Sequence, residues 1–479
     1  MQLNQLYING QWVDSLSGEA FDDLNPYTGD VYARVAKGTV QDADRALAAA
    51  YAARKIWAAT PPLERAQVLQ KASRILDARR QAFADVLTGE GGGTVGKVMF
   101  EISQTVDLLD TAAADSKRIL GETFHNDPAK LSMTLRRPKG TVVAITPWNF
   151  PLILAMYKVA YGIATGNTVV LKPASETPVI GLKIAELFEE AGLPPGVLNV
   201  ITGPGSVLGD ALIDDDRCSF VAITGETKTG IHVAQRAAAK LKGYTLELGG
   251  KNPLIVLADA DLDYAVKSAA FSAFLHQGEI CLSVDRVIVE APIVDAFTRG
   301  LTELAANLPV GDPALPTTFI GPVISDNQVR RIDALVQDAV VKGARLLTGG
   351  TYEQRLYRPT VLSDVTPDMR IYYEETFGPV VSIIPVADEK EALRVANDSS
   401  YGLSAGVITE NLEKAIFLAE GLEAGMVHVN DGSIDADACC PFGGCKGSGM
   451  GREGGHYSIE EMTELKWVTI QKKKRPLPF

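Results

Sequence analysis

Cys281, Glu247 and Asn149 are the side chains of this sequence whose types and surroundings best suit chemistry on a carbonyl group. Cys281 stands between a polar turn, HQGEIC, and an apolar run, LSVDRVIVE, which predicts a strand. A thiol must ionise to act as a nucleophile, because the ordinary pKa of cysteine is about 8.5. Glu247 lies among apolar residues in LELGG, where a lone carboxyl group should have a raised pKa that suits a general base. Asn149 carries its amide within PWNFP, directly after another apolar run.

Each of these residues also has a purely structural interpretation. Cys281 could be a buried, inert thiol, Glu247 an exposed and merely solvated acid, and Asn149 a turn residue between two prolines. The residue types alone do not decide between the two interpretations, so the elements that position the side chains matter.

An alternation of short apolar runs and helical stretches from about residue 140 to residue 248 predicts a parallel sheet covered on both faces. Ligands of such sheets bind at the carboxyl ends of the strands, and Asn149 follows the first of them. The predicted strands are 141–145, 168–171, 197–201 and 220–223, and the predicted helices are 151–165, 177–191, 206–213 and 227–240.

A second α/β series begins after Gly250, with strands at PLIVL, RVIVE, ARLLT, VVSIIPV, LSAGVIT and GMVHVN. Its predicted helices are 261–275, 293–307 and 388–397. Long helices at about 40–58 and 62–88 could pack on the first sheet, while segment 121–137 breaks the pattern and suggests a β-arm. The sequence therefore predicts two α/β lobes with a cleft between them.

Composition excludes several classes of function. The chain has 479 residues, 46% of them hydrophobic, and a net charge of −13, which argues against nucleic acid as a partner. The basic run 472–475 is interpreted as a solvated tail. The uncharged stretch 140–157 contains two prolines and an asparagine, so it predicts a strand, a turn and a helix, and no membrane partner is expected.

The cysteines are few, odd in number and without the spacing of metal ligands, so we expect neither disulfides nor a metal site. The N-terminus lacks the pattern of a secretory signal, which favours a cytoplasmic protein with reduced thiols. Apart from Cys281, we expect the cysteines to be packing residues: Cys218, Cys439, Cys440 and Cys445.

A set of ordered motifs, spread over about residues 5–470, closely resembles the aldehyde dehydrogenase superfamily. The motifs are PWNFPL, KPASETP, TGETKTG, LELGGKNP, HQGEIC, EETFGPV and PFGGCKGSG. The resemblance implies the α/β aldehyde dehydrogenase fold, with two Rossmann-like lobes and a small β oligomerisation arm. It assigns residues 1–119 and 139–249 to a dinucleotide-binding domain, 250–446 to a catalytic domain, and 120–138 with 462–474 to the arm.

The resemblance also implies an NAD(P)⁺-dependent oxidation of an aldehyde to the acid. Cys281 would form a thiohemiacetal and then a thioester, and Asn149 with the cysteine's own N–H would hold the oxyanion. Glu247 would activate the hydrolytic water. Because the CoA-acylating branch generally lacks a glutamate at this position, we expect a free acid as the product.

NAD or NADP is the cofactor that the resemblance implies. Ser175 stands where strictly NAD-dependent relatives often carry glutamate, so a 2′-phosphate is permitted. Glu226 departs from the family pattern of a small hydroxyl residue, and its side chain is expected to point away or to cap the following helix. The expected cofactor-binding residues are Thr146, Trp148, Lys172, Ser175, Gly205, Gly225, Glu226, Leu248, Glu375 and Phe377.

HQGEIC and the segment NDGSIDADACCPFGG resemble the branch that acts on benzaldehyde-, vanillin- and salicylaldehyde-like compounds. An aromatic aldehyde is therefore the expected substrate, with an aliphatic aldehyde or a semialdehyde as the alternative. Relatives assemble as dimers or tetramers, and the sequence does not choose between them. The expected substrate pocket consists of Phe150, Leu154, Tyr157, Ile280 and Leu282.

Two other classes of function compete with this interpretation. GLSAG matches the G-x-S-x-G motif of serine hydrolases with Ser404 at its centre. The nucleophile elbow needs a strand before the serine and a helix after it, and here the predicted order is reversed. A non-catalytic binding role would leave the chain free to lose one of Asn149, Glu247, Cys281 or Glu375, yet all four are present.

Overall fold

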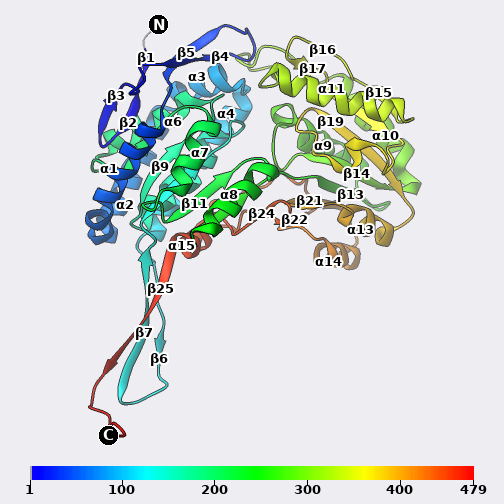
Figure 1. Cartoon of the computed structure of the whole chain (residues 1–479). Coiled ribbons are helices and arrows are strands. Elements are labelled where there is room, and N and C mark those ends of the chain that lie inside the picture. The colour runs from blue at the N-terminus through cyan, green and yellow to red at the C-terminus, as the bar shows by residue number, and fades with distance from the viewer. Residues whose placement is uncertain (1–2) are drawn as a thin grey trace.

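The first lobe is built on the four strands predicted between residues 140 and 248, together with β12, which was not predicted. The computed structural model describes residues 3–479, which form two α/β lobes and a long β arm (Figure 1). The sheet of the first lobe has the order β24-β12-β11-β8-β9-β10-β2-β3, and β8 to β12 run parallel. The parallel strands are β8 (Thr141–Ile145), β9 (Thr168–Lys172), β10 (Leu198–Val200), β11 (Phe220–Thr224) and β12 (Gly243–Glu247).

The helices between these strands cover both faces of the sheet. Those following β8 and β9 pack in one hydrophobic cluster and those following β10 and β11 in another. The order in which strands are added to the sheet therefore reverses at β8, which lies between β9 and β11. Such a switch point opens a crevice at the carboxyl ends of the strands. The predicted helices are confirmed as α5 (Pro151–Ala164), α6 (Pro178–Ala191), α7 (Gly205–Asp214) and α8 (Thr227–Ala239).

The N-terminal part differs from the prediction in two respects. The single helix predicted at 62–88 is wrong, because the chain breaks at Arg79 (φ −113°, ψ 22°) into two helices. A further helix, α4, was not predicted, although Val98, Ile102 and Leu109 repeat at helical spacing and are buried. The helices are α1 (Val40–Ala59), α2 (Pro62–Ala78), α3 (Arg80–Gly91) and α4 (Val95–Asp115).

Short strands at the N-terminus extend the first lobe. β2 (Leu6–Ile8) and β3 (Gln11–Val13) form one edge of the large sheet, and β24 (Gly449–Met450) forms the other. A separate small sheet contains β1 (Leu3–Asn4), β4 (Ala20–Leu24) and β5 (Val31–Ala36).

The second lobe repeats the architecture of the first around a sheet of order β15-β18-β19-β14-β13-β21-β22. Its strands are β13 (Asn252–Val256), β14 (Val284–Glu290), β15 (Arg345–Thr348), β18 (Thr360–Ser363), β19 (Val380–Val386), β21 (Ser404–Ile408) and β22 (Met426–Val429). Its helices are α9 (Leu262–Phe274), α10 (Val294–Ala306), α11 (Asp326–Val341), α12 (Arg370–Tyr373), α13 (Glu389–Asn397), α14 (Leu412–Gly421) and α15 (Gly455–Met462), of which the last packs back on the first lobe. The predicted strands and helices of this lobe are present, whereas β18, α11, α12, α14 and α15 were not predicted.

The segment that broke the pattern is a β-arm, as predicted. β7 (Lys130–Pro138) pairs antiparallel with β25 (Thr463–Gln471), from Pro138↔Thr463 to Lys130↔Gln471, and β6 (Thr123–Phe124) completes the sheet. The arm projects away from both lobes, with the C-terminus at its tip (Figure 1).

Stretch 140–157 is confirmed as a strand, a turn and a helix, namely β8 and the start of α5. Within residues 3–479, no helix combines the length and the apolarity that crossing a membrane requires.

Candidate active site

Two cavities meet at Asn149 and Cys281. The larger has a volume of about 530 Å³ and the smaller about 260 Å³. Among residues 3–479, these two residues alone line both cavities. The Cys281 thiol and the Asn149 amide thus lie at the junction of the two cavities, where molecules bound in each cavity can come into contact.

Cys281 is positioned by a strained turn before β14. His276 and Gln277 adopt left-handed backbone angles (φ 48° and 45°), which non-glycine residues rarely do. At Gly278 a Cβ atom would lie 2.2 Å from the carbonyl oxygen of Gly378, so only glycine fits there. The Asn252 side-chain amide donates to the Cys281 carbonyl at 2.7 Å and fixes the backbone of Cys281 from the other side.

The surroundings of Cys281 keep its thiol protonated. Burial, followed by the carboxylates of Glu375 and Glu247, raises the pKa of Cys281 to about 12. The backbone N–H groups of Cys281 and Leu282 lie beside the sulfur and partly oppose this shift. Ionisation of the thiol therefore needs help from a base or from a bound positive charge.

Alkylation of Cys281 in the cofactor-free protein should accordingly accelerate with pH. Only the thiolate reacts with iodoacetamide, so with a pKa of about 12 the rate should still be rising at about pH 9. Peptide mass spectrometry would measure this rate for Cys281 separately from the rates for Cys439 and Cys440. A plateau below pH 8 would show that the thiol is activated without cofactor.

Asn149 lies in the turn between β8 and α5, at the switch point of the first sheet. Its side-chain amide donates to the backbone carbonyl of Glu279 at 2.9 Å. This contact ties the asparagine to the turn that carries Cys281. Asn149 and Cys281 are thus brought together as the sequence predicts.

Glu247 ends β12 and is buried, but it lines neither cavity. Neither of its carboxylate oxygens has a hydrogen-bond partner among residues 3–479. Burial first, and then the neighbouring carboxylate of Glu453, raises the pKa of Glu247 well above its ordinary value. A Cβ atom on Gly443 would come within 2.7 Å of Oε1, so this glycine leaves room for the carboxyl group.

The smaller cavity lies at the switch-point crevice and at the N-terminus of α8. Glu375 accepts a hydrogen bond from the Gly250 N–H at 2.9 Å, and burial raises the pKa of Glu375 to about 7. Trp148 and Phe377 meet edge to face at 5.4 Å. Six of the predicted cofactor-binding residues line this cavity: Trp148, Gly225, Glu226, Leu248, Glu375 and Phe377.

The residues of this cavity fit a dinucleotide. A pyrophosphate binds favourably at an uncapped helix N-terminus, and Glu226 at the N-cap of α8 makes no capping hydrogen bond with its side chain. Of the two alternatives expected for Glu226, capping of the helix is excluded, and the residue lines the cavity. The rings of Trp148 and Phe377 offer apolar surface, and the half-buried Glu375 offers an acceptor, in the cavity that Cys281 also lines.

The other predicted cofactor residues lie outside this cavity. Lys172 ends β9, and burial lowers its pKa to about 8. Its Nζ lies 3.8 Å from where a Cβ atom of Gly205 would stand, at the start of α7. Ser175 donates to the Gly203 carbonyl at 3.2 Å, and the hydroxyl of Thr146 is buried without a partner in the described chain.

The larger cavity is mostly apolar and rich in aromatic rings. All five predicted substrate-pocket residues line it, and Tyr157 stacks on Phe442 with ring centroids 6.0 Å apart. Sequence reasoning missed further rings because they come from α4, α9 and loops distant in the sequence. The missed rings are Phe100, Phe271, Phe319 and Phe442.

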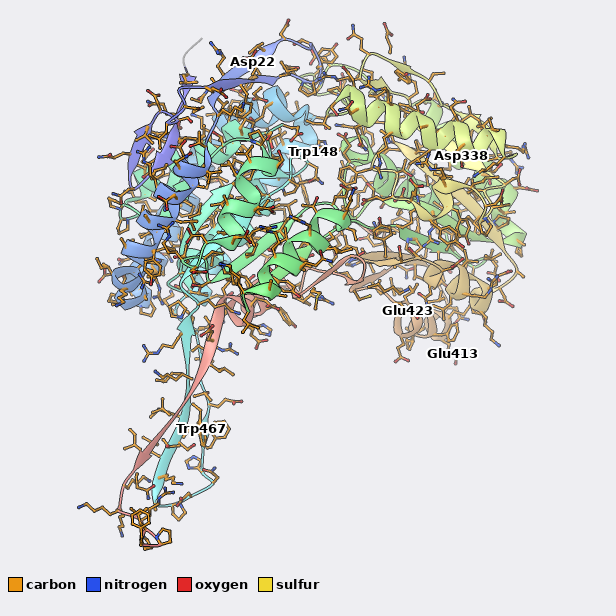
Figure 2. The ribbon with its side chains drawn as sticks, in the orientation of Figure 1. Asp22, Trp148, Asp338, Glu413, Glu423 and Trp467 are labelled. Atoms are coloured by element: carbon orange, nitrogen blue, oxygen red, sulfur yellow. The ribbon has the colours of Figure 1, made fainter. Side chains whose placement is uncertain are left out.

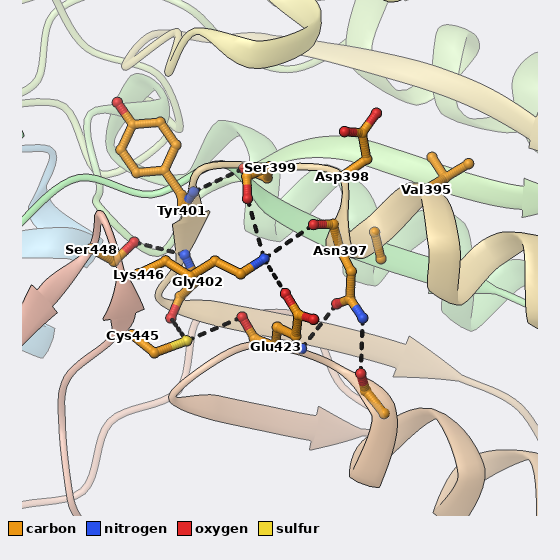
Figure 3. A network of polar contacts seen from close by, with 12 residues as sticks. Val395, Asn397, Asp398, Ser399, Tyr401, Gly402, Glu423, Cys445, Lys446 and Ser448 are labelled. Atoms are coloured by element: carbon orange, nitrogen blue, oxygen red, sulfur yellow. Dashed lines mark hydrogen bonds and ion pairs between the residues drawn. The ribbon is translucent and has the colours of Figure 1, made fainter.

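The prediction that the other cysteines pack in the interior is wrong for Cys439 and Cys440, which are exposed. Cys218 is buried, as expected. Cys445 is half-buried and donates to the carbonyls of Glu423 and Gly402 at 3.2 and 3.4 Å (Figure 3). Beside it Lys446 pairs with Glu423, so this network joins β23 (Cys445–Lys446) to the second lobe.

Ser404 does not stand on a nucleophile elbow. It begins strand β21, is buried, and donates its hydroxyl hydrogen to the Ser433 carbonyl at 2.7 Å. A hydrolase serine must be exposed at a strand-to-helix turn, so the hydrolase interpretation fails.

The sequence profile of the Aldehyde dehydrogenase family matches residues 12–468 of the chain. The protein therefore belongs to the aldehyde dehydrogenase family, enzymes that oxidise aldehydes with NAD or NADP.

Individual relatives are similar along their whole length. A salicylaldehyde dehydrogenase of Pseudomonas putida is 41% identical over 99% of both chains. A benzaldehyde dehydrogenase of Bacillus subtilis is 40% identical over 100% of this chain and 99% of the relative. The crystal structure of a salicylaldehyde dehydrogenase from Pseudomonas putida G7, complexed with salicylaldehyde, superimposes with a TM-score of 0.98 at 39% identity, covering 100% of both chains.

Proposed function

We propose that the protein oxidises aromatic aldehydes to carboxylic acids through a thioester on Cys281. The observation that carries this proposal is the meeting of the two cavities at Asn149 and Cys281. The larger cavity would hold the aldehyde and the smaller one the nicotinamide end of NAD or NADP.

The chain's own residues divide the reaction between them. The Cys281 thiol loses its proton to solvent, and the resulting thiolate adds to the aldehyde carbon while the carbonyl π electrons move to oxygen. The Asn149 amide and the Cys281 N–H hold the resulting oxyanion of the thiohemiacetal. NAD or NADP, when bound, would supply the hydride acceptor, and loss of hydride from the thiohemiacetal carbon re-forms the C=O bond as a thioester. Glu247 then takes a proton from water as the water oxygen attacks the thioester, and the thiolate departs as the acid forms.

Glu247 must turn toward Cys281 for this last step, because its carboxylate lies outside both cavities. Its buried carboxylate oxygens have no partner among the described residues, so no hydrogen bond opposes the rotation. A raised pKa also makes the ionised carboxylate a stronger base.

The remaining cofactor contacts follow from position in the sheet. Trp148, Glu375 and Phe377 would surround the nicotinamide ribose and ring, and the N-terminus of α8 would face the pyrophosphate. Lys172, with Gly205 beside it, would reach the adenine ribose, and Ser175 leaves room for a 2′-phosphate.

Benzaldehyde should be oxidised with a kcat/KM at least about tenfold above that of hexanal. A flat ring fills a cavity bordered by Phe150, Tyr157 and Phe442 better than a flexible chain does, and loses less conformational freedom. Steady-state kinetics of both aldehydes at saturating NAD⁺ and NADP⁺ test this. Equal values, or a preference for hexanal, would contradict the aromatic specificity and favour the aliphatic alternative.

We also propose that the arm mediates self-association. β25 is an edge strand, and it exposes Leu465 and Trp467 at 60% and 67%. Figure 2 shows Trp467 on the arm, away from both lobes. Exposed apolar side chains on an unpaired edge are typical of a strand that adds to a second chain. The free state of all five cysteines supports a cytoplasmic location.

Replacing both Leu465 and Trp467 by lysine should therefore lower the molar mass in solution by at least half. Light scattering after size exclusion measures the mass. Leu241→Lys is the matched control, because Leu241 is 96% exposed on the body of the first lobe. An unchanged mass in the double variant, or a wild-type monomer, would rule out the arm as the interface.

A further inference from the structure

We infer that His276 and Lys97 are positioning residues, which hold Asn149 so that its amide faces the oxygen of the substrate. Neither side chain was predicted from the sequence to belong to the site. The inference rests on the proposed oxyanion role of Asn149 and extends it to the groups that fix its geometry.

The two side chains converge on one atom. Lys97 Nζ and His276 Nε2 lie 2.7 and 2.9 Å from the backbone carbonyl oxygen of Asn149. A carbonyl oxygen accepts two hydrogen bonds, so this one is saturated. The carbonyl is thus held from α4 and from the turn before Cys281, while the Asn149 amide donates to the Glu279 carbonyl at 2.9 Å. Of the two amide hydrogens, one is committed in this way and the second is available to the substrate.

Lys97 belongs to a buried ion pair, and removing its two charges from water costs free energy. It contacts Glu101 at 2.6 Å, and the exposed fractions of the two side chains are 2% and 0%. Glu101 in turn accepts the backbone N–H groups of Leu152 and Ile153 at 2.9 and 3.2 Å, in the first turn of α5. A buried pair seldom adds stability over apolar residues of the same size, but it can fix one geometry. Here it fixes the start of α5 and the turn that precedes it.

His276 is held in the one state that can donate to a carbonyl without carrying charge. Burial, and then the nearby Lys97 ammonium, lower the pKa of His276 well below its ordinary value, so the ring is neutral. The imidazole ring of His276 stands edge-on to the Phe150 ring, with 5.5 Å between the centroids. Lys97 Nζ lies 4.2 Å from the centroid of the Phe150 ring. Phe150 therefore packs between the two donors, and the strained backbone at His276 is tolerated where it aims Nε2 at Asn149.

A matched pair of variants tests the hydrogen bond from His276. Glutamine can place an N–H close to the position of Nε2, whereas methionine has nearly the same size and no donor. His276→Met should lower the single-turnover rate of NADH formation by about tenfold or more, since a small displacement of a catalytic group is costly. His276→Gln should recover most of the rate, and KM for benzaldehyde should change little in either variant. An equal loss in both variants would overturn the inference.

A double-mutant cycle separates positioning from general damage. Asn149→Ala should lower the single-turnover rate by about 10²- to 10³-fold. In that background His276→Met should change the rate by less than about twofold, because the group through which it acts is gone. A further tenfold loss would overturn the positioning role and leave the proposed function intact. No effect of Asn149→Ala by itself would overturn the proposed oxyanion role, and this inference with it.

A second variant approaches the same carbonyl from the other side if His276→Met does not fold. Lys97→Met with Glu101→Gln removes both charges and keeps an acceptor for the N–H groups at the start of α5. Each rate is divided by the amount of protein whose Cys281 reacts with iodoacetamide under native conditions, so that only folded protein is counted. The same tenfold loss, absent in the Asn149→Ala background, is expected, and an unchanged rate would overturn the inference.

Discussion

Cys281→Ser should lower the rate of aldehyde oxidation by about three orders of magnitude or more. The alcohol that replaces the thiol is a far weaker nucleophile at neutral pH and has no base placed to activate it. Cofactor binding should be unchanged, because Cys281 contributes only the end of the smaller cavity. Single-turnover formation of NADH and a fluorescence titration with NADH measure the two quantities.

Cys439→Ser is the matched control for this result. Cys439 is an exposed thiol beyond both cavities, so its replacement should leave the rate within about twofold. Retention of activity in Cys281→Ser, or its loss in the control, would place the nucleophile elsewhere.

Glu247→Gln should separate the two halves of the reaction. Thioester formation does not need the carboxylate, so a burst of NADH equal to the number of active sites should remain. Steady-state turnover should fall by about 10²- to 10³-fold, because no base then activates the water. Rapid-mixing measurements with benzaldehyde resolve the burst from the slow phase that follows it.

Glu461→Gln serves as the control for Glu247. Glu461 is a half-buried acid close enough to influence the pKa of Glu247, and the proposed reaction gives it no role. It should keep the burst and at least half of the turnover. If the burst disappears in Glu247→Gln, the carboxylate acts in thioester formation, and the proposed division of labour is wrong.

The sequence predicted the elements that carry the site because their signals are local. The strands β8, β9 and β11 are runs of β-branched and apolar residues. The turns that line the crevice come directly after such runs in the sequence. Asn149 was expected at the site because it occupies the turn at the carboxyl end of β8, whereas Cys281 lies in the turn before β14 and was expected beside Asn149 from the family motifs.

The parts that were missed depend on contacts between distant segments. Lys97 and His276 are 179 positions apart (276 − 97) and are brought together by the Asn149 carbonyl and the Phe150 ring. No pattern within α4 marks Lys97 as part of the site, and the helix itself was overlooked after the glycine-rich run 91–93. The position of the Glu247 carboxylate, outside both cavities, depends on side-chain rotation, which a sequence does not encode locally.

In the proposed reaction the sulfur of Cys281 carries the acyl group of the substrate. Glu247→Gln protein mixed with benzaldehyde and NAD⁺, then quenched in acid, should retain this intermediate. Peptide mass spectrometry should find one benzoyl group on the peptide containing Cys281, in the same amount as the NADH burst. A full burst with Cys281 unmodified, or with the benzoyl group on another residue, would show that Cys281 does not carry the acyl group.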